Sequence, residues 1–320
     1  MERTLEDLEG LIGKTPLIKI TYKYNGQIRC SYMKAEWFNM SGSIKDRVAF
    51  SIIKKAYETG ELKKGQEIIE TTSGNMGLSF SALGAFLGHP VKIFMPEFMS
   101  KERKDLIKLF GGQLVYGASF TELFASAEQY AKTHDVFTPL QFENQFNVEA
   151  HINTTAPEIE KQADNKIEAV VAGVGTGGTL IGLSKYFKGK DENVKAFAVE
   201  PKQSSLLTFG KSKGKHRIQG LSDEIIPPIY DKDLVNEVIA IDDTDAIAMA
   251  QKLSTELGLP VGISGGANFL GTVLCGMNNV ASVFADDNKK YLSTDLANKV
   301  KTPLTESIEF IAIKTVRYND

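Results

Sequence analysis

The sequence predicts an α/β protein built from two parallel-sheet domains, each with its sheet between layers of helices. Short runs rich in β-branched and apolar residues alternate with helical stretches over most of the 320-residue chain. Strands that alternate with helices of about 10–15 residues are typical of βαβ units, in which the strands run parallel. A chain of this length also favours two lobes over one.

The first sheet is expected between residues 41 and 146, which we assign to a smaller, mobile domain. Three strand–helix pairs follow one another in this range. They read "QEIIETT" before "GNMGLSFSALGAFLG", "VKIFMP" before "SKERKDLIKLFG", and "GQLVYG" before "SFTELFASAEQYAKTH". Each pair has the length of one strand and one helix, so the range predicts a parallel sheet.

The second sheet is expected in the larger domain, which we assign to residues 1–40 together with 147–320. Here "IEAVVAG" precedes a glycine-rich loop, "VKAFAVEP" follows the next helix, and "EVIAIDDTDAIAMAQKLSTELG" repeats the strand–helix pattern. The tail "LTESIEFIAIKTVRYND" alternates in part and is expected to form an edge strand.

Composition excludes several classes of protein. The formal net charge is −3 with both signs dispersed, so the sequence shows no basic footprint for nucleic acid. No apolar run reaches the roughly 18 residues of a membrane-spanning helix, and the charged start "MERTLEDLEG" lacks the apolar core of a signal peptide. Two cysteines in unlike contexts, Cys30 and Cys275, fit a reducing cytoplasm better than a disulfide framework. The four histidines lack metal-ligand spacing, so no metal site is expected.

The loop "GVGTGGT" at residues 173–179 predicts an anion site. Glycine lets the backbone approach a ligand closely, and successive amides in such a loop can converge on a phosphate. The helix expected after the loop adds the positive end of its dipole. Taken alone, the loop is equally compatible with an ordinary strand-to-helix turn.

Other loops with unusual chemistry follow predicted strands. They are "TTSGNMG" and the approach to "PVGISGGAN", and ligands of parallel α/β sheets bind at such carboxyl ends of strands. A further segment, "NMSGSIKDR", places Lys45 near the start of a helix. Anion-binding glycines, hydroxyl donors and a lysine together suit a cofactor that carries a phosphate and an aldehyde.

Seven motifs in order make the chain similar to the fold-type II enzymes of pyridoxal 5'-phosphate, which have the tryptophan synthase β-like fold. Among these it resembles the family of cysteine synthase (O-acetylserine sulfhydrylase) and cystathionine β-synthase. The resemblance covers nearly the whole chain apart from the last twenty or so residues. The motifs are "IGKTPL" (12–17), "SGSIKDR" (41–47), "TTSGNMG" (71–77), "QFEN" (141–144), "GTGGT" (175–179), "HRIQGL" (216–221) and "GISGGA" (262–267).

The resemblance implies a role for each cofactor-binding position. Lys45 would attach the cofactor as a Schiff base and, once freed by substrate, would move the proton at Cα. Asn75 would donate to the 3'-oxygen of the cofactor, and Ser264 would face its pyridine nitrogen. A neutral hydroxyl there makes the ring a weaker electron sink, which favours loss of a β-substituent. The phosphate would be held by Gly175, Thr176, Gly177, Gly178 and Thr179.

The substrate site is implied in the same way. The carboxylate of an amino-acid substrate would be bound by Thr72, Ser73 and Gly74 of the "TSGN" loop and by Gln141 of "LQFEN". Closure of this loop would also exclude water from the reaction.

One departure from the family pattern bears on the reaction. The family's glycine-rich "GIGAGFIP" reads "GLSDEIIP" at residues 220–227, which introduces Asp223 and Glu224. Cystathionine β-synthases resemble this chain in having an acidic residue in the same loop, aligned roughly with Glu224. A carboxylate beside Cβ can act as base for an incoming water or thiol, so Asp223 is a catalytic candidate. The alternative is a solvated acidic turn.

The resemblance therefore implies a pyridoxal-phosphate-dependent β-replacement, through an aminoacrylate, on a serine- or cysteine-type amino acid. The open alternatives are ordinary cysteine synthesis, release of hydrogen sulfide from L-cysteine with water or a thiol entering, and cystathionine synthesis. A serine or threonine dehydratase shares the fold, but the motif sequences "TSGN" and "GTGGT" argue against this function. The resemblance also implies a cytoplasmic homodimer that acts on a small molecule, without nucleic-acid or membrane partners.

Overall fold

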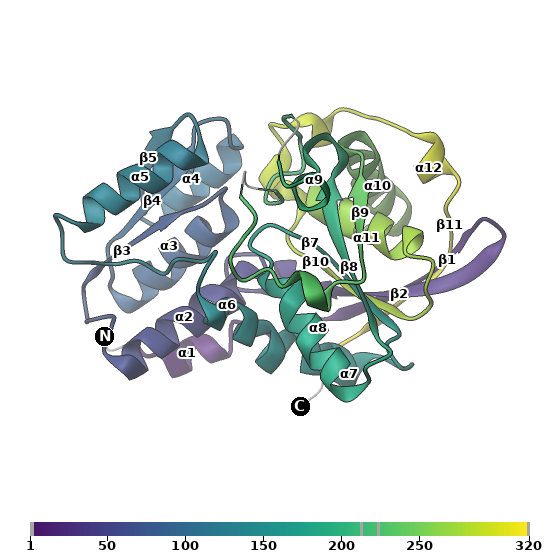
Figure 1. The fold of residues 1–320 in the computed structure, drawn as a ribbon, viewed down its shortest axis with the longest axis horizontal. Coiled ribbons are helices and arrows are strands. Elements are labelled where there is room, and N and C mark those ends of the chain that lie inside the picture. Colours follow the sequence, from purple (N-terminus) through teal and green to yellow (C-terminus); the bar gives the residue numbers. More distant parts are fainter. Residues whose placement is uncertain (1–2, 212–213, 223–224, 319–320) are drawn as a thin grey trace.

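Two α/β lobes lie side by side in the structure, a computed structural model that describes residues 3–211, 214–222 and 225–318 (Figure 1). One lobe contains a four-stranded sheet and the other a seven-stranded sheet. The four-stranded sheet lies inside the range predicted for the smaller domain, and the seven-stranded sheet is built from segments on both sides of that range. The exact division at residues 41 and 146 stays a prediction.

The smaller sheet is wholly parallel, with strand order β5-β4-β3-β6. Side chains alternate between its faces, so that Ile68 and Ile93 pack toward α2, α3 and α4 while Ile69 and Phe94 pack toward α5. Both faces are covered, as in other parallel sheets. Its elements are α2 (Lys45–Thr59), β3 (Glu67–Thr71), α3 (Asn75–Leu87), β4 (Val91–Pro96), α4 (Lys101–Leu109), β5 (Gln113–Gly117), α5 (Phe120–Ala131) and β6 (Val136–Phe137).

The larger sheet has strand order β11-β1-β2-β10-β7-β8-β9. Helices α10 and α11 cover one face, and α7 and α8 cover the other. Its strands are β1 (Leu17–Tyr24), β2 (Gln27–Ala35), β7 (Ala169–Gly173), β8 (Lys195–Pro201), β9 (Glu237–Ile241), β10 (Val280–Phe284) and β11 (Glu309–Val316). The helices that cover this sheet are α7 (Ala156–Gln162), α8 (Gly178–Lys190), α10 (Asp243–Leu257) and α11 (Ile263–Leu274). The shorter helices of the described residues are α1 (Leu5–Glu9) and α6 (Gln145–Ala150), which pack into the core of the smaller lobe, and α9 (Leu206–Phe209) and α12 (Pro303–Glu306).

One edge of this sheet departs from the parallel pattern. Strand β1 runs antiparallel to both β2 and β11, whereas the remaining pairs are parallel. The cause is local, because β1 and β2 are joined by Asn25 and Gly26, which both have positive φ (49° and 77°). An Asn-Gly pair in this conformation forms a two-residue hairpin turn. The expected edge strand in the tail is confirmed as β11.

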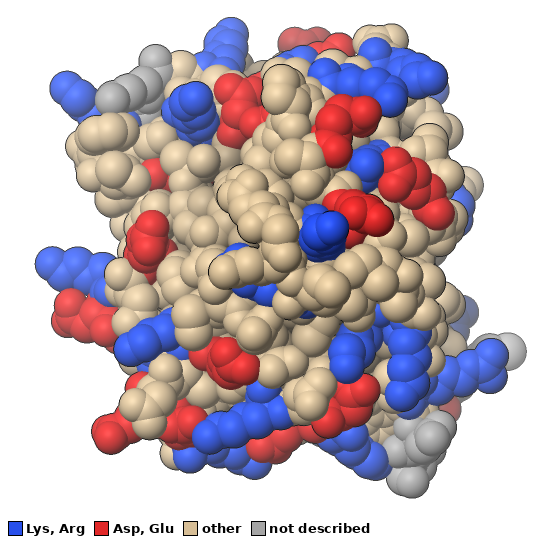
Figure 2. All heavy atoms as spheres, turned by 90° about the vertical axis from the view of Figure 1, so that its right-hand side faces the viewer, with Lys and Arg blue, Asp and Glu red and all other residues tan. Residues whose placement is uncertain are grey.

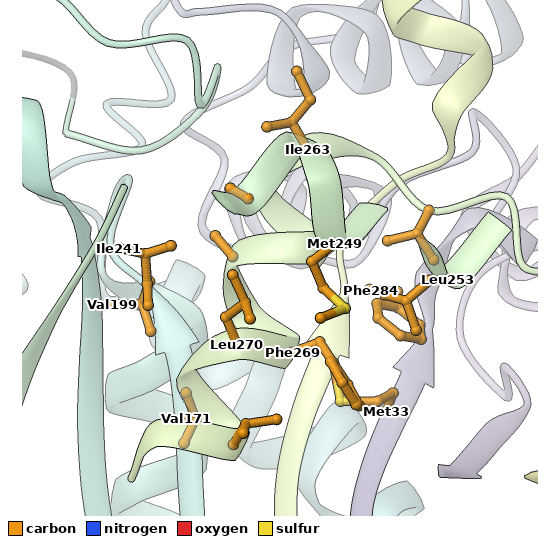
Figure 3. Close-up of a cluster of buried hydrophobic side chains, with 14 of the residues drawn as sticks. Met33, Val171, Val199, Ile241, Met249, Leu253, Ile263, Phe269, Leu270 and Phe284 are labelled. Atoms are coloured by element: carbon orange, nitrogen blue, oxygen red, sulfur yellow. The ribbon is translucent and has the colours of Figure 1, made fainter. Parts of the chain in front are cut away.

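One core of the larger lobe lies between its sheet and helices α10 and α11 (Figure 3). Phe269 and Leu270 of α11 are fully buried and pack among Val171 and Val199 from the sheet. Gly271 allows this close approach, because a Cβ there would lie 2.5 Å from a methyl group of Val199. The tight packing fixes the position of α11 and therefore of Ser264 in its first turn.

The surface of the larger lobe shows charges of both signs interspersed over one face (Figure 2). This agrees with the dispersed charge expected from the sequence. Among the helices of the described residues, none combines the length and apolarity needed to cross a membrane.

Candidate active site

A pocket with about 720 Å³ of empty space, part of it open to solvent, lies between the two lobes. Its walls come from the loops after β3, β7 and β10 and from the first residues of α2, α3 and α11. The structure brings these predicted residues together in its lining: Lys45, Thr72, Ser73, Asn75, Gln141, Gly175, Thr176, Gly177, Thr179 and Ser264.

The glycine loop has the geometry of a phosphate cradle. Gly177 has φ of +87°, and a Cβ on Gly175 would lie only 2.2 Å from the carbonyl oxygen of Gly220. No side chain caps the start of α8, so the first amides of this helix are left for an anion. These observations fit the phosphate of the expected cofactor.

Gly178 does not line the pocket, and its place is set by Asn147. A Cβ on Gly178 would lie 2.0 Å from the Asn147 side-chain oxygen. The Asn147 amide donates to the Thr176 hydroxyl (2.9 Å) and to the carbonyl oxygen of Gln141 (2.8 Å). Asn147 therefore joins the phosphate loop to the expected substrate loop. The sequence offered no signal for it beyond its place after "QFEN".

Lys45 is the first residue of α2 and reaches from the smaller lobe toward the glycine loop. Its Nζ donates to the Thr176 hydroxyl at 3.3 Å. The amine thus lies next to the loop that would hold the phosphate, where a covalently attached cofactor needs it.

A buried ion-pair network holds the beginning of α2. Arg47 donates to Glu36, the residue directly after β2 (2.7 Å), and to Glu158 of α7 (2.7 Å), and the Lys34 Nζ lies 2.6 Å from a carboxylate oxygen of Glu158. Burial opposes ionisation of Glu36, but the charge and hydrogen bonds of Arg47 outweigh it and lower the pKa of this carboxyl. Because Arg47 is two residues from Lys45, the network fixes the helix that presents the lysine.

The side chains expected around the ring lie at two helix starts. Asn75 begins α3, and its Nδ2 donates to Asp286 at 2.8 Å, which leaves its second N–H for a further acceptor. Ser264 lies in the first turn of α11, and only 7% of its surface is exposed. Both positions suit the contacts that the resemblance implies.

The substrate loop is ordered by its own hydrogen bonds. The Thr72 hydroxyl accepts from the backbone N–H of Gly74 (3.0 Å), and the Gln141 amide donates to the carbonyl oxygen of Thr71 (2.8 Å). Gly74 has φ of +143°, and a Cβ there would lie 2.2 Å from the Cδ of Arg103, so this turn of the loop requires glycine. The part of Gly74 in carboxylate binding stays a prediction.

The pocket also contains polar residues for which the sequence predicted no role, although two of them lie in the segments "HRIQGL" and "PVGISGGAN". Arg103 of α4, Gln219 and Asn268 line it. Arg103 belongs to "SKERKDLIKLFG", where a charged helix normally faces solvent, yet only 1% of its surface is exposed. Asn268 accepts from the backbone N–H of Gly173 (2.8 Å) and donates to Val283 (2.9 Å), which fixes the end of β7.

The buried carboxyl group of Glu70 holds the substrate loop through backbone hydrogen bonds. Its two oxygens accept backbone N–H groups from Thr71 (2.8 Å) and Gln141 (3.2 Å). Burial raises its pKa to about 8, against the opposing effects of these hydrogen bonds and of the charge of Lys45. Folding therefore favours the protonated form of Glu70.

This shift predicts the pH dependence of stability. The stabilisation from neutral Glu70 is fully present below its ordinary pKa of 4.5 and is lost as the pH rises to about 8. Glu70→Gln keeps a neutral side chain at every pH, so the advantage of wild type over the variant in free energy of unfolding should shrink between about pH 5 and pH 9. Urea unfolding at both pH values measures it, with exposed Glu61→Gln as control. A difference that stays constant with pH would contradict the assignment.

The acidic residues Asp223 and Glu224 lie outside the described residues. The segment before them belongs to the pocket, since Gly220 and Leu221 line it and the Ser222 N–H donates to the carbonyl of Val174 (3.0 Å). The expected catalytic role of Asp223 stays a prediction.

Comparison with known proteins adds the deciding observation. A family described as pyridoxal-phosphate dependent enzyme matches residues 8–282. This chain belongs to that family. The predicted family, fold and cofactor are thereby confirmed, and the protein is an enzyme that uses pyridoxal phosphate.

Its relatives narrow the chemistry. The chain is 34% identical to cysteine synthase of Staphylococcus aureus, over 92% of this chain and 98% of the relative. It is 38% identical to cysteine synthase B of Campylobacter jejuni, over 91% and 98%. It is 44% identical to the solved hydrogen sulfide-producing enzyme of Fusobacterium nucleatum, with a TM-score of 0.93 over 98% of each chain. The enzyme thus performs cysteine synthase-like β-replacement on an amino-acid substrate.

Proposed function

We propose that the enzyme releases hydrogen sulfide from L-cysteine, with water or a thiol entering at Cβ. With water, L-cysteine and H₂O give L-serine and H₂S: the Cβ–S bond breaks and a Cβ–O bond forms. The bound cofactor supplies the electron sink that makes loss of the Cα proton and of the β-substituent possible.

The observation that carries this proposal is the acidic pair that follows the pocket wall. Gly220 and Leu221 line the pocket, and Asp223 and Glu224 come directly after Ser222 in the sequence. Water and neutral thiols must lose a proton when they add to carbon, whereas hydrosulfide is already largely anionic near neutral pH. A positioned base contributes about 10²–10⁴-fold to such a step. An acidic loop therefore suits water or a thiol better than sulfide.

We assign to the other residues the roles that the family resemblance implies, and their places around the pocket support this. Thr72, Ser73 and Gln141 orient the substrate carboxylate, and Lys45 takes and returns the proton at Cα. When the cofactor is bound, Ser264 would face the pyridine nitrogen with a neutral hydroxyl, Asn75 would donate to the 3'-oxygen, and the loop from Gly175 to Thr179 would hold the phosphate.

The hydrogen sulfide-producing enzyme of F. nucleatum supports the choice of substrate, since its 44% identity exceeds the 34% and 38% of the two cysteine synthases. A variant of that enzyme with aspartate replaced by asparagine, 44% identical to this chain, is known in complex with an α-aminoacrylate intermediate. In this chain we assign activation of the incoming nucleophile to Asp223.

The second candidate is ordinary cysteine synthesis from O-acetylserine and sulfide. It is favoured by the cysteine synthases among the relatives, which the chain matches over more than nine-tenths of its length. The two functions differ in the leaving group and in the nucleophile, and both can be assayed directly.

We expect purified enzyme to release sulfide from L-cysteine and to form serine, or a thioether when a thiol is added. Asp223→Asn should slow the complete reaction about 10²-fold or more, because the entering water loses its base, while an absorbing enzyme-bound species accumulates. Absorbance spectra and sulfide assays measure both effects. Glu224→Gln tests the neighbouring carboxylate, and exposed Asp233→Asn is the matched control.

Efficient cysteine formation from O-acetylserine and sulfide, with the same rate in the Asp223→Asn variant, would contradict the proposal and establish the ordinary synthase.

We further propose a cytoplasmic homodimer, as in the family that the chain resembles. Sedimentation at micromolar concentration should give twice the 35.1 kDa mass of the chain.

A further inference from the structure

We propose that Asp286 positions Asn75 toward the cofactor and links this contact to the packing of the two lobes. The inference rests on the proposed role of Asn75 as donor to the 3'-oxygen. It assigns to Asp286, two residues after β10, a part in cofactor binding that the motifs alone did not suggest.

The side chain of Asp286 is the centre of a buried polar cluster. Its Oδ2 accepts from Asn75 Nδ2 (2.8 Å) and from the Tyr291 hydroxyl (2.8 Å), and it lies 3.4 Å from Arg103 Nη2. Arg103 also donates to the Tyr291 hydroxyl at 2.6 Å. None of the Asp286 surface is exposed, so the carboxylate depends on these partners for stabilisation.

The backbone of this segment joins two further parts of the site. Asp286 pairs with Ser43 in an isolated antiparallel bridge, and Ala285 accepts from the Ile44 N–H at 2.9 Å. The Gly262 N–H donates to the Asp286 carbonyl at 3.2 Å. These contacts lie one or two residues from Lys45 and two residues from Ser264, so one segment connects three of the expected cofactor contacts.

The space around the carboxylate is closed. A Cβ on Gly262 would lie 2.1 Å from Asp286 Oδ1, so the side chain rests directly on the glycine backbone. Oδ1 itself has no hydrogen-bond partner among the described residues. The carboxylate is held there by the charge of Arg103 and by the two donors on Oδ2, Asn75 and Tyr291.

The consequence for Asn75 is chemical. A side-chain amide can present either its oxygen or its nitrogen to a ligand, and a hydrogen bond to its other face selects the orientation. A carboxylate accepts only, so Asp286 must face Nδ2 and not Oδ1. Nδ2 then has one remaining N–H with which to meet a negatively charged oxygen. Without Asp286 the amide can turn and offer its oxygen, which repels that group.

The same cluster crosses the boundary between the lobes. Asn75 and Arg103 come from α3 and α4 of the smaller lobe, whereas Asp286 and Tyr291 follow β10 in the larger lobe (Figure 1). The contact that orients Asn75 therefore forms only when the lobes are packed as they are here. Cofactor binding and lobe packing should stabilise each other.

The test is a titration of cofactor-free protein with pyridoxal phosphate, followed by visible absorbance. Asp286→Asn should weaken binding about 10–100-fold, the worth of a hydrogen bond to a charged group, and should shift the visible absorption band. Asp287→Asn is the matched control, because Asp287 contacts the backbone N–H of Lys289 (3.1 Å) rather than the pocket. Trp37, the single tryptophan, stacks on Phe284 with 5.8 Å between the ring centroids. Its fluorescence therefore reports whether the segment around Asp286 keeps its fold.

A double-mutant cycle with Asn75→Ala tests whether Asp286 acts through Asn75. If Asp286 acts through Asn75, Asp286→Asn should change neither affinity nor absorbance in the Asn75→Ala background. If Asn75→Ala binds pyridoxal phosphate with the affinity and absorbance of wild type, the proposed role of Asn75 is wrong. If Asp286→Asn still changes affinity or absorbance in the Asn75→Ala background, only the positioning role of Asp286 is wrong. Tyr291→Phe, which removes one donor and keeps the ring, should give a smaller change in the same direction. If Asp286→Asn does not fold, Tyr291→Phe takes its place in the test. Unchanged cofactor binding by Tyr291→Phe would then contradict the inference.

Discussion

Lys45→Ala should reduce turnover by about 10³-fold or more and should abolish covalent attachment of the cofactor. The variant loses both the amine that binds the aldehyde and the base that moves the Cα proton, and each contribution is large. The fold should survive, because the hydrogen bond from Lys45 to the Thr176 hydroxyl is long, at 3.3 Å. Borohydride reduction followed by peptide mass analysis measures attachment, and steady-state rates with L-cysteine measure turnover.

The matched control is Lys55→Ala in the same helix, near its exposed end. This protein should be yellow, and reduction should fix the cofactor to the peptide that contains Lys45. Covalent label on any other lysine, or a fully active Lys45→Ala enzyme, would remove Lys45 from the mechanism.

Arg47→Met should lower the free energy of unfolding by about 3–5 kcal/mol, the usual cost of breaking a buried ion pair. Arg47 is 2% exposed and is the shared cation of Glu36 and Glu158. Without it, both carboxylates remain buried, with Lys34 as the nearest cation at 2.6 Å from Glu158. Turnover should fall as well, since the network fixes the turn of α2 that carries Lys45.

Urea unfolding measures the loss, and Lys54→Met is the control from the same helix. Lys54 pairs with Glu9 at 2.9 Å, but both side chains are about half exposed, so that change should cost about 1 kcal/mol or less. Equal losses for the two variants would show that burial of the Arg47 network contributes nothing extra.

The sequence carried most of the fold and most of the candidate site. Alternating strands and helices predicted the two sheets, and seven motifs pointed to a pyridoxal-phosphate enzyme. The motifs predicted the residues now found around one pocket, because the glycine, lysine and hydroxyl-bearing residues of the site occur in short contiguous segments. The antiparallel hairpin of β1 and β2 was missed, although its Asn25–Gly26 turn is itself a local signal.

Short segments of sequence specify the local chemistry: a lysine at the start of a helix, a glycine loop after a buried strand, and a serine in the first turn of another helix. The groups that support these residues become visible only once the chain is folded. Arg103, Asn147 and Asp286 are polar residues whose spacing resembles that of solvent-facing positions, yet each is at least 95% buried. Their hydrogen-bond partners lie 29 or more positions away in the chain for the Asn147–Thr176, Asn75–Asp286 and Arg103–Tyr291 pairs. Such pairings depend on how two lobes pack, and no short-range pattern encodes them.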